Sequence, residues 1–171
     1  MAKHLLLLAG VCCLLFLLNA GSLPLADPEE SRCGLIVRDM LKNGHWLVPH
    51  LQGKPYYDKP APFFWLAAAG VRLTGSEELG GRLVAALAGL LAVLATYVFA
   101  RRAFRSDLAG LLAGLVLATS GEFLFMARWY RMDMPFAAAM WAALWWFWRS
   151  EDARLAGRRP GKTSTWLGFY L

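Results

Sequence analysis

The chain has 171 residues, of which 58% are hydrophobic, and its mean hydropathy is +0.42. In soluble domains roughly half of the residues are apolar, so this excess excludes an ordinary soluble fold and indicates a membrane protein. The net charge of +6 does not indicate a nucleic-acid-binding protein, because the basic residues lie in short stretches between apolar segments and not on one face.

An apolar stretch begins after Lys3 and continues to about residue 25. A bilayer core of about 30 Å requires about 20 helical residues, so this stretch predicts a first transmembrane helix over residues 5–25. A cleaved signal peptide is the alternative interpretation, because the small residues at positions 19–22 resemble a cleavage site. Further apolar segments follow, and they favour an uncleaved helix.

An outer segment of about residues 26–78 follows this helix, too long for a simple turn and too apolar for a disordered linker. Apolar residues at helical spacing predict two amphipathic helices, over residues 30–41 and 62–73, which we expect to lie in the plane of the membrane interface. Glycines and prolines predict an irregular connector between them. His45 and His50 lie in this connector without a partner four residues away, so these two alone do not predict a metal site.

Three further apolar segments predict transmembrane helices over residues 79–100, 108–126 and 134–148, and a fifth begins at about residue 166. A chain that ends in the first turn of such a helix is expected to be the amino-terminal portion of a longer protein or a truncated product. The predicted fold class is therefore all-α, with polytopic transmembrane helices and amphipathic helices in the first outer loop. Residues 1–171 are predicted to be part of one transmembrane domain.

The basic residues predict how the chain is oriented in the membrane. Three arginines lie in the loop at residues 101–105, and a second basic stretch covers residues 149–162. The positive-inside rule places both loops in the cytoplasm, together with the amino terminus that carries Lys3. The segment at residues 26–78 and the turn at residues 128–133 are then expected on the outer, periplasmic side.

Three groups of charged residues fall on this outer side. They are Asp27, Glu29, Glu30 and Arg32 after the first helix, Tyr56, Asp58 and Lys59 between prolines, and Arg128, Arg131 and Asp133 between the third and fourth helices. Each group has a structural alternative: a helix cap, a loop of mixed charge, and an ion pair that fixes the hairpin. Together, fixed cations and carboxylates suit an anionic ligand whose neighbouring atom gains or loses a proton.

The order of these groups resembles the membrane glycosyltransferases of the GT-C fold. The resemblance is closest to the aminoarabinose (4-amino-4-deoxy-L-arabinose) transferase-like family 83, which is related to the protein O-mannosyltransferases. The motifs that carry it are Glu29-Glu30-Ser31-Arg32, Gly44-His45-Trp46-Leu47-Val48-Pro49, Tyr56-Tyr57-Asp58-Lys59-Pro60, and Arg128 followed by Asp133-Met134-Pro135. The resemblance implies a polyprenyl-phosphate-linked sugar donor and an acceptor, either a lipid A-like glycolipid or a protein, at the outer face of a bacterial inner membrane.

The resemblance also implies the role of each site residue. Glu29 stands where the family usually has a catalytic Asp, with Asp27 as the alternative carboxylate and Asp133 as an assisting one. Lys59, Arg32 and Tyr56 are expected to bind the donor phosphate, and the remaining site residues are Glu30, Asp58, Arg128 and Arg131. No cofactor is required by the sequence, although Asp58 corresponds to an acid near which relatives can bind a divalent metal. A non-catalytic membrane module is the alternative function, and neither the sugar nor the acceptor is identified.

Overall fold

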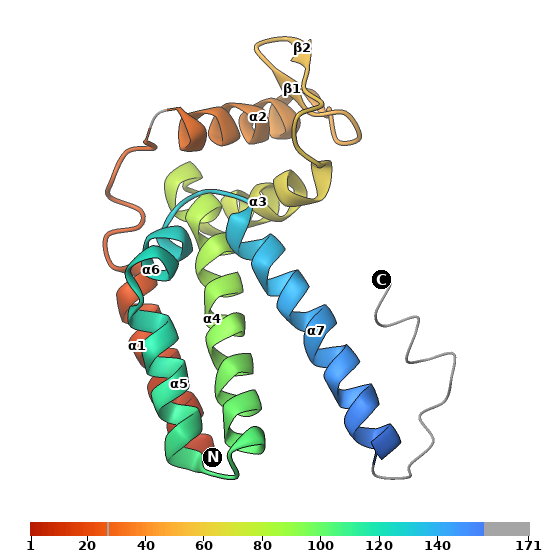
Figure 1. Ribbon diagram of the computed structural model, residues 1–171. Helices are drawn as coiled ribbons and strands as arrows, with labels where there is room; N and C mark the ends of the chain where they lie inside the picture. The colour runs from red at the N-terminus through yellow and green to blue at the C-terminus, as the bar shows by residue number, and fades with distance from the viewer. Residues whose placement is uncertain (27, 156–171) are drawn as a thin grey trace. The chain divides into compact units, whose positions relative to one another are not determined.

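The structure, a computed structural model, describes residues 1–26 and 28–155 (Figure 1). Its elements are α1 (Ala2–Leu17), α2 (Glu29–Asn43), β1 (His50–Leu51), β2 (Lys54–Pro55), α3 (Ala61–Thr74), α4 (Glu77–Ala103), α5 (Asp107–Thr119), α6 (Gly121–Arg128) and α7 (Asp133–Leu155). The predicted all-α fold class is confirmed. Two predictions, the site residue Asp27 and the helix beginning at residue 166, lie outside the described residues.

The chain divides into two compact units, residues 1–135 and residues 136–171. In the second unit, the ring of Trp145 lies 5.9 Å from that of Trp141 and 5.5 Å from that of Trp148, measured between centroids. Spacings of three and four residues place these rings on one face of α7. Every charged group discussed below belongs to the first unit.

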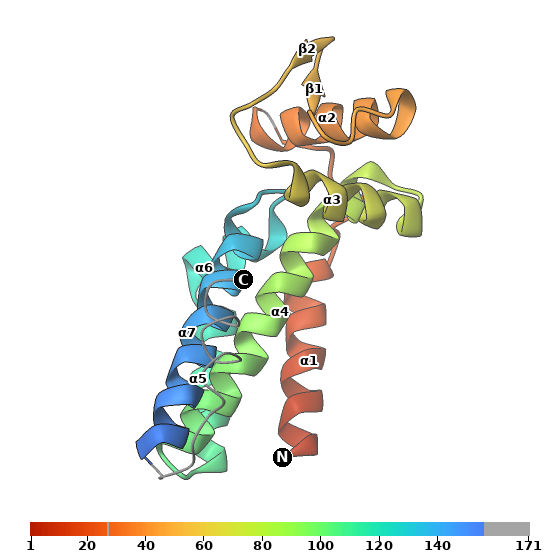
Figure 2. The same cartoon turned by 90° about the vertical axis from the view of Figure 1, so that its right-hand side faces the viewer.

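The central helix of the first unit is α4, which contacts α1, α3, α5 and α6. Helices α1, α4 and α5 run side by side (Figures 1 and 2). The buried face of α4 is rich in small residues, among them Gly81, Ala85, Gly89 and Ala92. Small side chains let helix backbones approach closely, and this is how helices associate where lipid removes the hydrophobic driving force.

Large apolar side chains cover the outer faces of these helices. Leu6 on α1 is 74% exposed, Leu91 on α4 is 63% exposed and Val116 on α5 is 69% exposed. Large apolar side chains that are exposed on three neighbouring helices are suited to lipid contact. Within the described residues, α4 alone is long and apolar enough to cross a membrane, and α5 with α6 qualifies as a second span with a bend; α1 is apolar but shorter.

The helices differ most from the predicted ones at α1, at α5 with α6, and at α7, which continues to Leu155 beyond the predicted end at residue 148. Helix α1 ends at Leu17 although the apolar sequence continues, because Asn19 has a left-handed backbone (φ 59°) and Pro24 cannot extend a helix. The segment predicted as a span over residues 108–126 contains two helices instead of one: the chain breaks at Ser120, and α5 and α6 are bent by 65° relative to each other. Serine followed by glycine is unfavourable inside a helix, and Ser120 with Glu122 in the next turn forms a favourable start.

Helices α2 and α3 lie across one end of the α1, α4 and α5 bundle (Figures 1 and 2). Buried side chains of α2, including Ile36 and Met40, form a cluster with Phe64 and Ala67 of α3. Helix α3 in turn lies close against α4, where a methyl group at Gly70 would overlap the backbone of Gly80. This close approach requires glycine at both positions.

The connector between α2 and α3 is more regular than predicted. It contains a short antiparallel hairpin in which His50 of β1 lies opposite Pro55 of β2. Gln52 and Gly53 at its tip have φ angles of 53° and 77°, as a tight turn of the type I′ class requires. The hairpin returns the chain to the start of α3 and so places residues 56–59 beside α2.

Candidate active site at the start of α2

Glu29 is the first residue of α2, and it lies between two cations. Its Oε2 accepts a hydrogen bond of 2.7 Å from Nζ of Lys59, and its Oε1 accepts one of 3.1 Å from Nη1 of Arg32. Arg32 is one helical turn further along α2, whereas Lys59 is delivered by the loop before α3. The exposed fractions of these side chains are 27% for Glu29, 34% for Arg32 and 17% for Lys59, so a ligand can reach all three.

The electrostatic environment keeps this group ionised. The hydrogen bond from Lys59 lowers the pKa of Glu29; burial opposes this, and the charges of Lys59, Arg32 and Arg131 add to it. Burial acts to lower the pKa of Lys59, but the hydrogen bond to Glu29 outweighs it and the pKa is raised. Glu29 is therefore a carboxylate and Lys59 an ammonium ion, and both keep their charge near neutral pH.

Tyr56 connects the cations to Asp58. Its hydroxyl donates a hydrogen bond of 3.1 Å to Oδ2 of Asp58, and its ring lies edge-on to Phe64 of α3 at 6.3 Å between centroids. The pKa of Arg32 is raised, chiefly through a hydrogen bond with Tyr56 and then by the charge of Glu29. The second predicted group is thus brought to the first.

Arg131 belongs to the third predicted group, and its charge acts on Glu29. Its Nε lies 3.0 Å from Oδ2 of Asp133, its guanidinium lies over the ring of Trp129 at 5.6 Å, and its charge contributes to the lowered pKa of Glu29. Asp133 is the first residue of α7. Asp133 is thus paired with Arg131, and the charge of Arg131 acts on Glu29.

Arg128 is directed elsewhere. Its guanidinium donates to the carbonyl oxygens of Leu15 and Leu18, the latter at 2.8 Å. These carbonyls belong to the last turn of α1 and its end, where helical acceptors have no partner within the helix. Arg128 thus caps α1, instead of forming the ion pair with Asp133 that the sequence offered as one alternative.

Glu30, the neighbour of Glu29, is buried and takes part in a separate network. Oε1 accepts hydrogen bonds from Nε of Arg82 at 2.9 Å and from the backbone N–H of Tyr130 at 2.8 Å. Oε2 accepts from Nη2 of Arg82 at 2.7 Å and from the backbone N–H of Ala26 at 2.8 Å. All four acceptor positions of the carboxylate are used, so Glu30 holds the fold and has none left for a ligand.

Arg82 of α4 is equally saturated. Besides Glu30, its guanidinium donates to the carbonyl oxygens of Ala20 (2.6 Å), Leu23 (2.7 Å) and Pro24 (2.8 Å). With these bonds all five of its N–H groups have acceptors, as a buried arginine requires. This role was not predicted from the sequence; the signal that could have indicated it is a single arginine in the apolar sequence that follows Gly80 and Gly81.

The carboxylate of Asp58 accepts a hydrogen bond from the hydroxyl of Tyr56. The metal position predicted at Asp58 stays a prediction. Across the described ranges, a set of three ligand-type side chains close enough to share an ion occurs at Asp39, His45 and His50 instead. This set was not predicted from the sequence, because only the folded connector brings the two histidines to the aspartate.

Most of the chain is similar to known proteins. Residues 58–167, more than half of the chain, match the model of the family described as dolichyl-phosphate-mannose-protein mannosyltransferase. The undecaprenyl phosphate-alpha-4-amino-4-deoxy-L-arabinose arabinosyl transferase 2 of Pseudomonas fluorescens (strain Pf0-1) is 31% identical over 153 residues, which cover 90% of this chain and 28% of that protein. The corresponding transferase of Edwardsiella ictaluri is 33% identical over 135 residues, covering 79% of this chain and 24% of that protein. The chain thus spans about a quarter of the length of these relatives.

Solved structures show the same fold. The crystal structure of ArnT from Cupriavidus metallidurans bound to undecaprenyl phosphate superimposes with a TM-score of 0.80 at 24% identity, over 99% of this chain and 31% of that one. Its apo state gives a TM-score of 0.77 at 27% identity, over 85% of this chain and 27% of that one. This is the membrane GT-C fold, and the resemblance found in the sequence is confirmed. The chain belongs to the dolichyl-phosphate-mannose-protein mannosyltransferase family and is related, over its matched length, to the aminoarabinose transferases.

Proposed function

We propose that this chain supplies the donor-phosphate and carboxylate part of a membrane glycosyltransferase. The enzyme would move a sugar from a polyprenyl-phosphate donor to a lipid A-like glycolipid or a protein. The observation that carries this proposal is Glu29 held by Lys59 at 2.7 Å and by Arg32 at 3.1 Å, with all three side chains accessible. The names of the relatives, which specify undecaprenyl phosphate and aminoarabinose, favour the same class of donor.

The donor phosphate would be bound by Lys59 and Arg32. An ammonium group has three N–H donors, and the bond to Glu29 uses one of them. Lys59 can therefore donate to a phosphate oxygen without leaving Glu29. As the bond between sugar and phosphate breaks, negative charge grows on the leaving phosphate, and two fixed cations stabilise it. Tyr56 would hold Arg32 in position and line the same site.

Glu29 would then orient or deprotonate the acceptor in an inverting transfer. In the free site its pKa is lowered by Lys59, so it is a weak base. A bound phosphate would neutralise part of the charge of Lys59 and Arg32, and the basicity of Glu29 would rise as a result. Donor binding would therefore prepare the carboxylate for its role, with Asp133 assisting through Arg131.

We further propose that the site faces the periplasm of a bacterial inner membrane, with the amino terminus in the cytoplasm. Two observations support this. The arginines at residues 101–105 lie at the carboxyl end of α4, where the positive-inside rule places the cytoplasm, and α2 and the hairpin lie at the opposite end of that helix (Figure 1). In a cysteine-free background, Tyr57→Cys should react with a membrane-impermeant maleimide in intact cells, and Phe104→Cys should react only after lysis. The reverse pattern would rule out this orientation.

The proposed activity is tested by transfer of labelled sugar from a polyprenyl-phosphate donor in membranes that contain the whole protein. Glu29→Gln and Lys59→Ala should abolish transfer and leave membrane insertion unchanged. Glu77→Gln is the matched control, because Glu77 also accepts from an arginine, Arg38, but lies outside the cluster. Wild-type turnover by the first two variants would contradict the assignment, and inactivity of the wild type with every donor would favour a non-catalytic module.

A further inference from the structure

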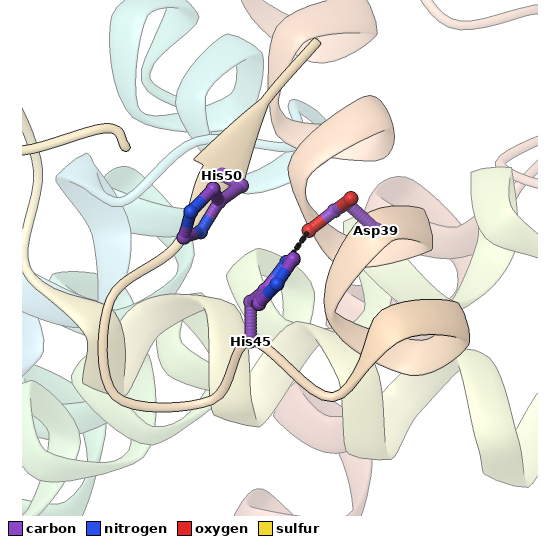
Figure 3. Close-up of side chains that lie close together, drawn as sticks. All are labelled: Asp39, His45 and His50. Atoms are coloured by element: carbon purple, nitrogen blue, oxygen red, sulfur yellow. Dashed lines mark hydrogen bonds and ion pairs between the residues drawn. The ribbon is translucent and has the colours of Figure 1, made fainter. Parts of the chain in front are cut away.

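Three side chains with metal-binding atoms meet at the carboxyl end of α2 (Figure 3). Asp39 comes from the helix, His45 from the turn after it and His50 from the start of β1, and one ligand atom from each lies within 4.8 Å of the other two. Oδ2 of Asp39 is already 2.7 Å from Nδ1 of His45. We propose that Asp39, His45 and His50 form a binding site for a divalent transition metal of the zinc class.

Further hydrogen bonds hold two of the proposed ligands, Asp39 and His50, in place. Oδ1 of Asp39 accepts a hydrogen bond of 2.6 Å from the amide of Asn43, which leaves Oδ2 directed at His45. Nδ1 of His50 lies 2.8 Å from the carbonyl oxygen of Val48. A carbonyl oxygen can only accept, so Nδ1 carries the proton and Nε2 offers its lone pair. Metal-binding histidines are typically oriented by such a bond to a backbone carbonyl.

The distances are close to those that coordination requires. Bonds of about 2.0–2.1 Å in a tetrahedral site place neighbouring ligand atoms about 3.3 Å apart. An upper limit of 4.8 Å between ligand atoms means that small side-chain rotations would complete the site. His45 lies in a turn that begins at Gly44, whose left-handed backbone (φ 77°) ends α2, so its position depends on the turn and not on a rigid helix.

The choice of ion follows from the ligands. Two imidazoles and one carboxylate suit zinc and similar transition metals, whereas magnesium and calcium prefer oxygen ligands throughout. The two histidine rings are stacked, with centroids 3.9 Å apart and an angle of 26° between the planes. A metal ion binds the neutral form of imidazole. Three protein ligands leave a fourth position for water.

The site would have a structural role in the outer segment. Asp39 follows Glu29 by ten positions in α2, which corresponds to about 15 Å along the helix axis. An ion there is too far from Glu29 to act on the same reacting atoms. It would instead tie α2 to β1 and hence fix the hairpin that leads to Tyr56 and Lys59. This inference is independent of the proposed transfer activity and also of the metal position predicted at Asp58.

The test is a titration of the full chain, purified in detergent and treated with a chelator, with zinc alone. We expect one zinc ion per chain, and at least about a tenfold weaker affinity in His45→Ala and in His50→Ala. His4→Ala is the matched histidine control and Asp107→Asn the matched carboxylate control, because both residues lie outside the cluster; both variants should bind zinc like the wild type. Affinity that is unchanged in the two histidine variants, or lost in Asp107→Asn, would overturn the proposal.

X-ray absorption of zinc on the wild-type chain keeps the test decisive if a variant does not fold. The expected spectrum contains scattering from two imidazole rings and a first shell of nitrogen and oxygen. Sulfur in the first shell would instead assign the ion to a thiol such as Cys33, a buried group whose pKa is raised by burial to about 11. Sulfur ligands, or fewer than two imidazoles, would overturn the proposal.

Discussion

Glu29 and Glu30 are consecutive in the sequence, yet their side chains end in opposite environments. Successive positions on a helix differ by about 100°, so one carboxylate points to Lys59 and the other into the bundle towards Arg82. Glu30 has a full set of four hydrogen bonds and is 1% exposed, whereas the side chain of Glu29 is 27% exposed and shared between two cations. A carboxylate is therefore available for chemistry only where the fold leaves some of its acceptor capacity unused.

The largest effect is expected at the buried pair. Arg82→Met should reduce the free energy of unfolding by about 3–5 kcal/mol, because it leaves the Glu30 carboxylate buried without its cation. Chemical denaturation in detergent micelles measures this. Arg72→Met is the control, since Arg72 is exposed over the ring of Trp46 and should change stability by less than about 1 kcal/mol. Equal stability of both variants would show that the Glu30 network does not hold the fold.

A smaller effect is expected at Glu29. Its coupling to Lys59, measured by a double-mutant cycle of Glu29→Gln and Lys59→Met, should be about 1 kcal/mol or less, because both groups remain partly accessible to water. The same variants should lose sugar transfer completely. A coupling energy as large as that of Arg82 with Glu30 would mean that the two adjacent glutamates play the same structural role.

The pH dependence of this pair has a definite sign. The pKa of Glu29 is lowered below its ordinary value of 4.5, chiefly by the hydrogen bond from Lys59. A carboxyl group with a lowered pKa in the folded state stabilises the fold fully above its ordinary pKa, and this stabilisation is lost as the pH falls through the folded value. The difference in melting temperature between the wild type and Glu29→Gln should therefore be constant near neutral pH and shrink below 4.5. A difference that grows on acidification would contradict the ion pair.

The smallest effect is expected at Arg38 and Glu77, which join α2 to α4 through two hydrogen bonds of 2.8 and 2.7 Å. The side chain of Arg38 is 58% exposed, so solvent screens the pair, and its coupling energy should be about 0.5 kcal/mol or less. A double-mutant cycle of Arg38→Met and Glu77→Gln, at low and high salt, measures it. A coupling above that of Glu29 with Lys59 would show that exposure does not rank these pairs.

Much of the fold was predictable from local patterns. The amphipathic helices expected over residues 30–41 and 62–73 correspond to α2 and α3, with ends shifted by at most two residues. The break at Ser120 was not predicted, because a hydropathy pattern averages over a single poor helix position. The membrane spans and their orientation remain predictions.

The grouping of the site was predictable in part. Glu29, Arg32, Tyr56, Asp58 and Lys59 do lie together, and Asp133 is paired with Arg131, whose charge acts on Glu29. The capping role of Arg128 and the saturation of Glu30 by Arg82 were not predicted. Both depend on acceptors and donors supplied by other helices, which no spacing in the sequence reveals.

By itself the sequence determined the helical class, the apolar surface, and the presence of charged motifs in the order of one family, because these follow from composition and local periodicity. Only the tertiary structure decided what each charge does. Two of the three partners of Glu30, Arg82 and Tyr130, are 52 and 100 positions away, and Lys59 reaches Glu29 from 30 positions away. Hydrogen bonds act over about 3 Å in space, whatever the separation along the chain, so their pairing is fixed only once the helices pack.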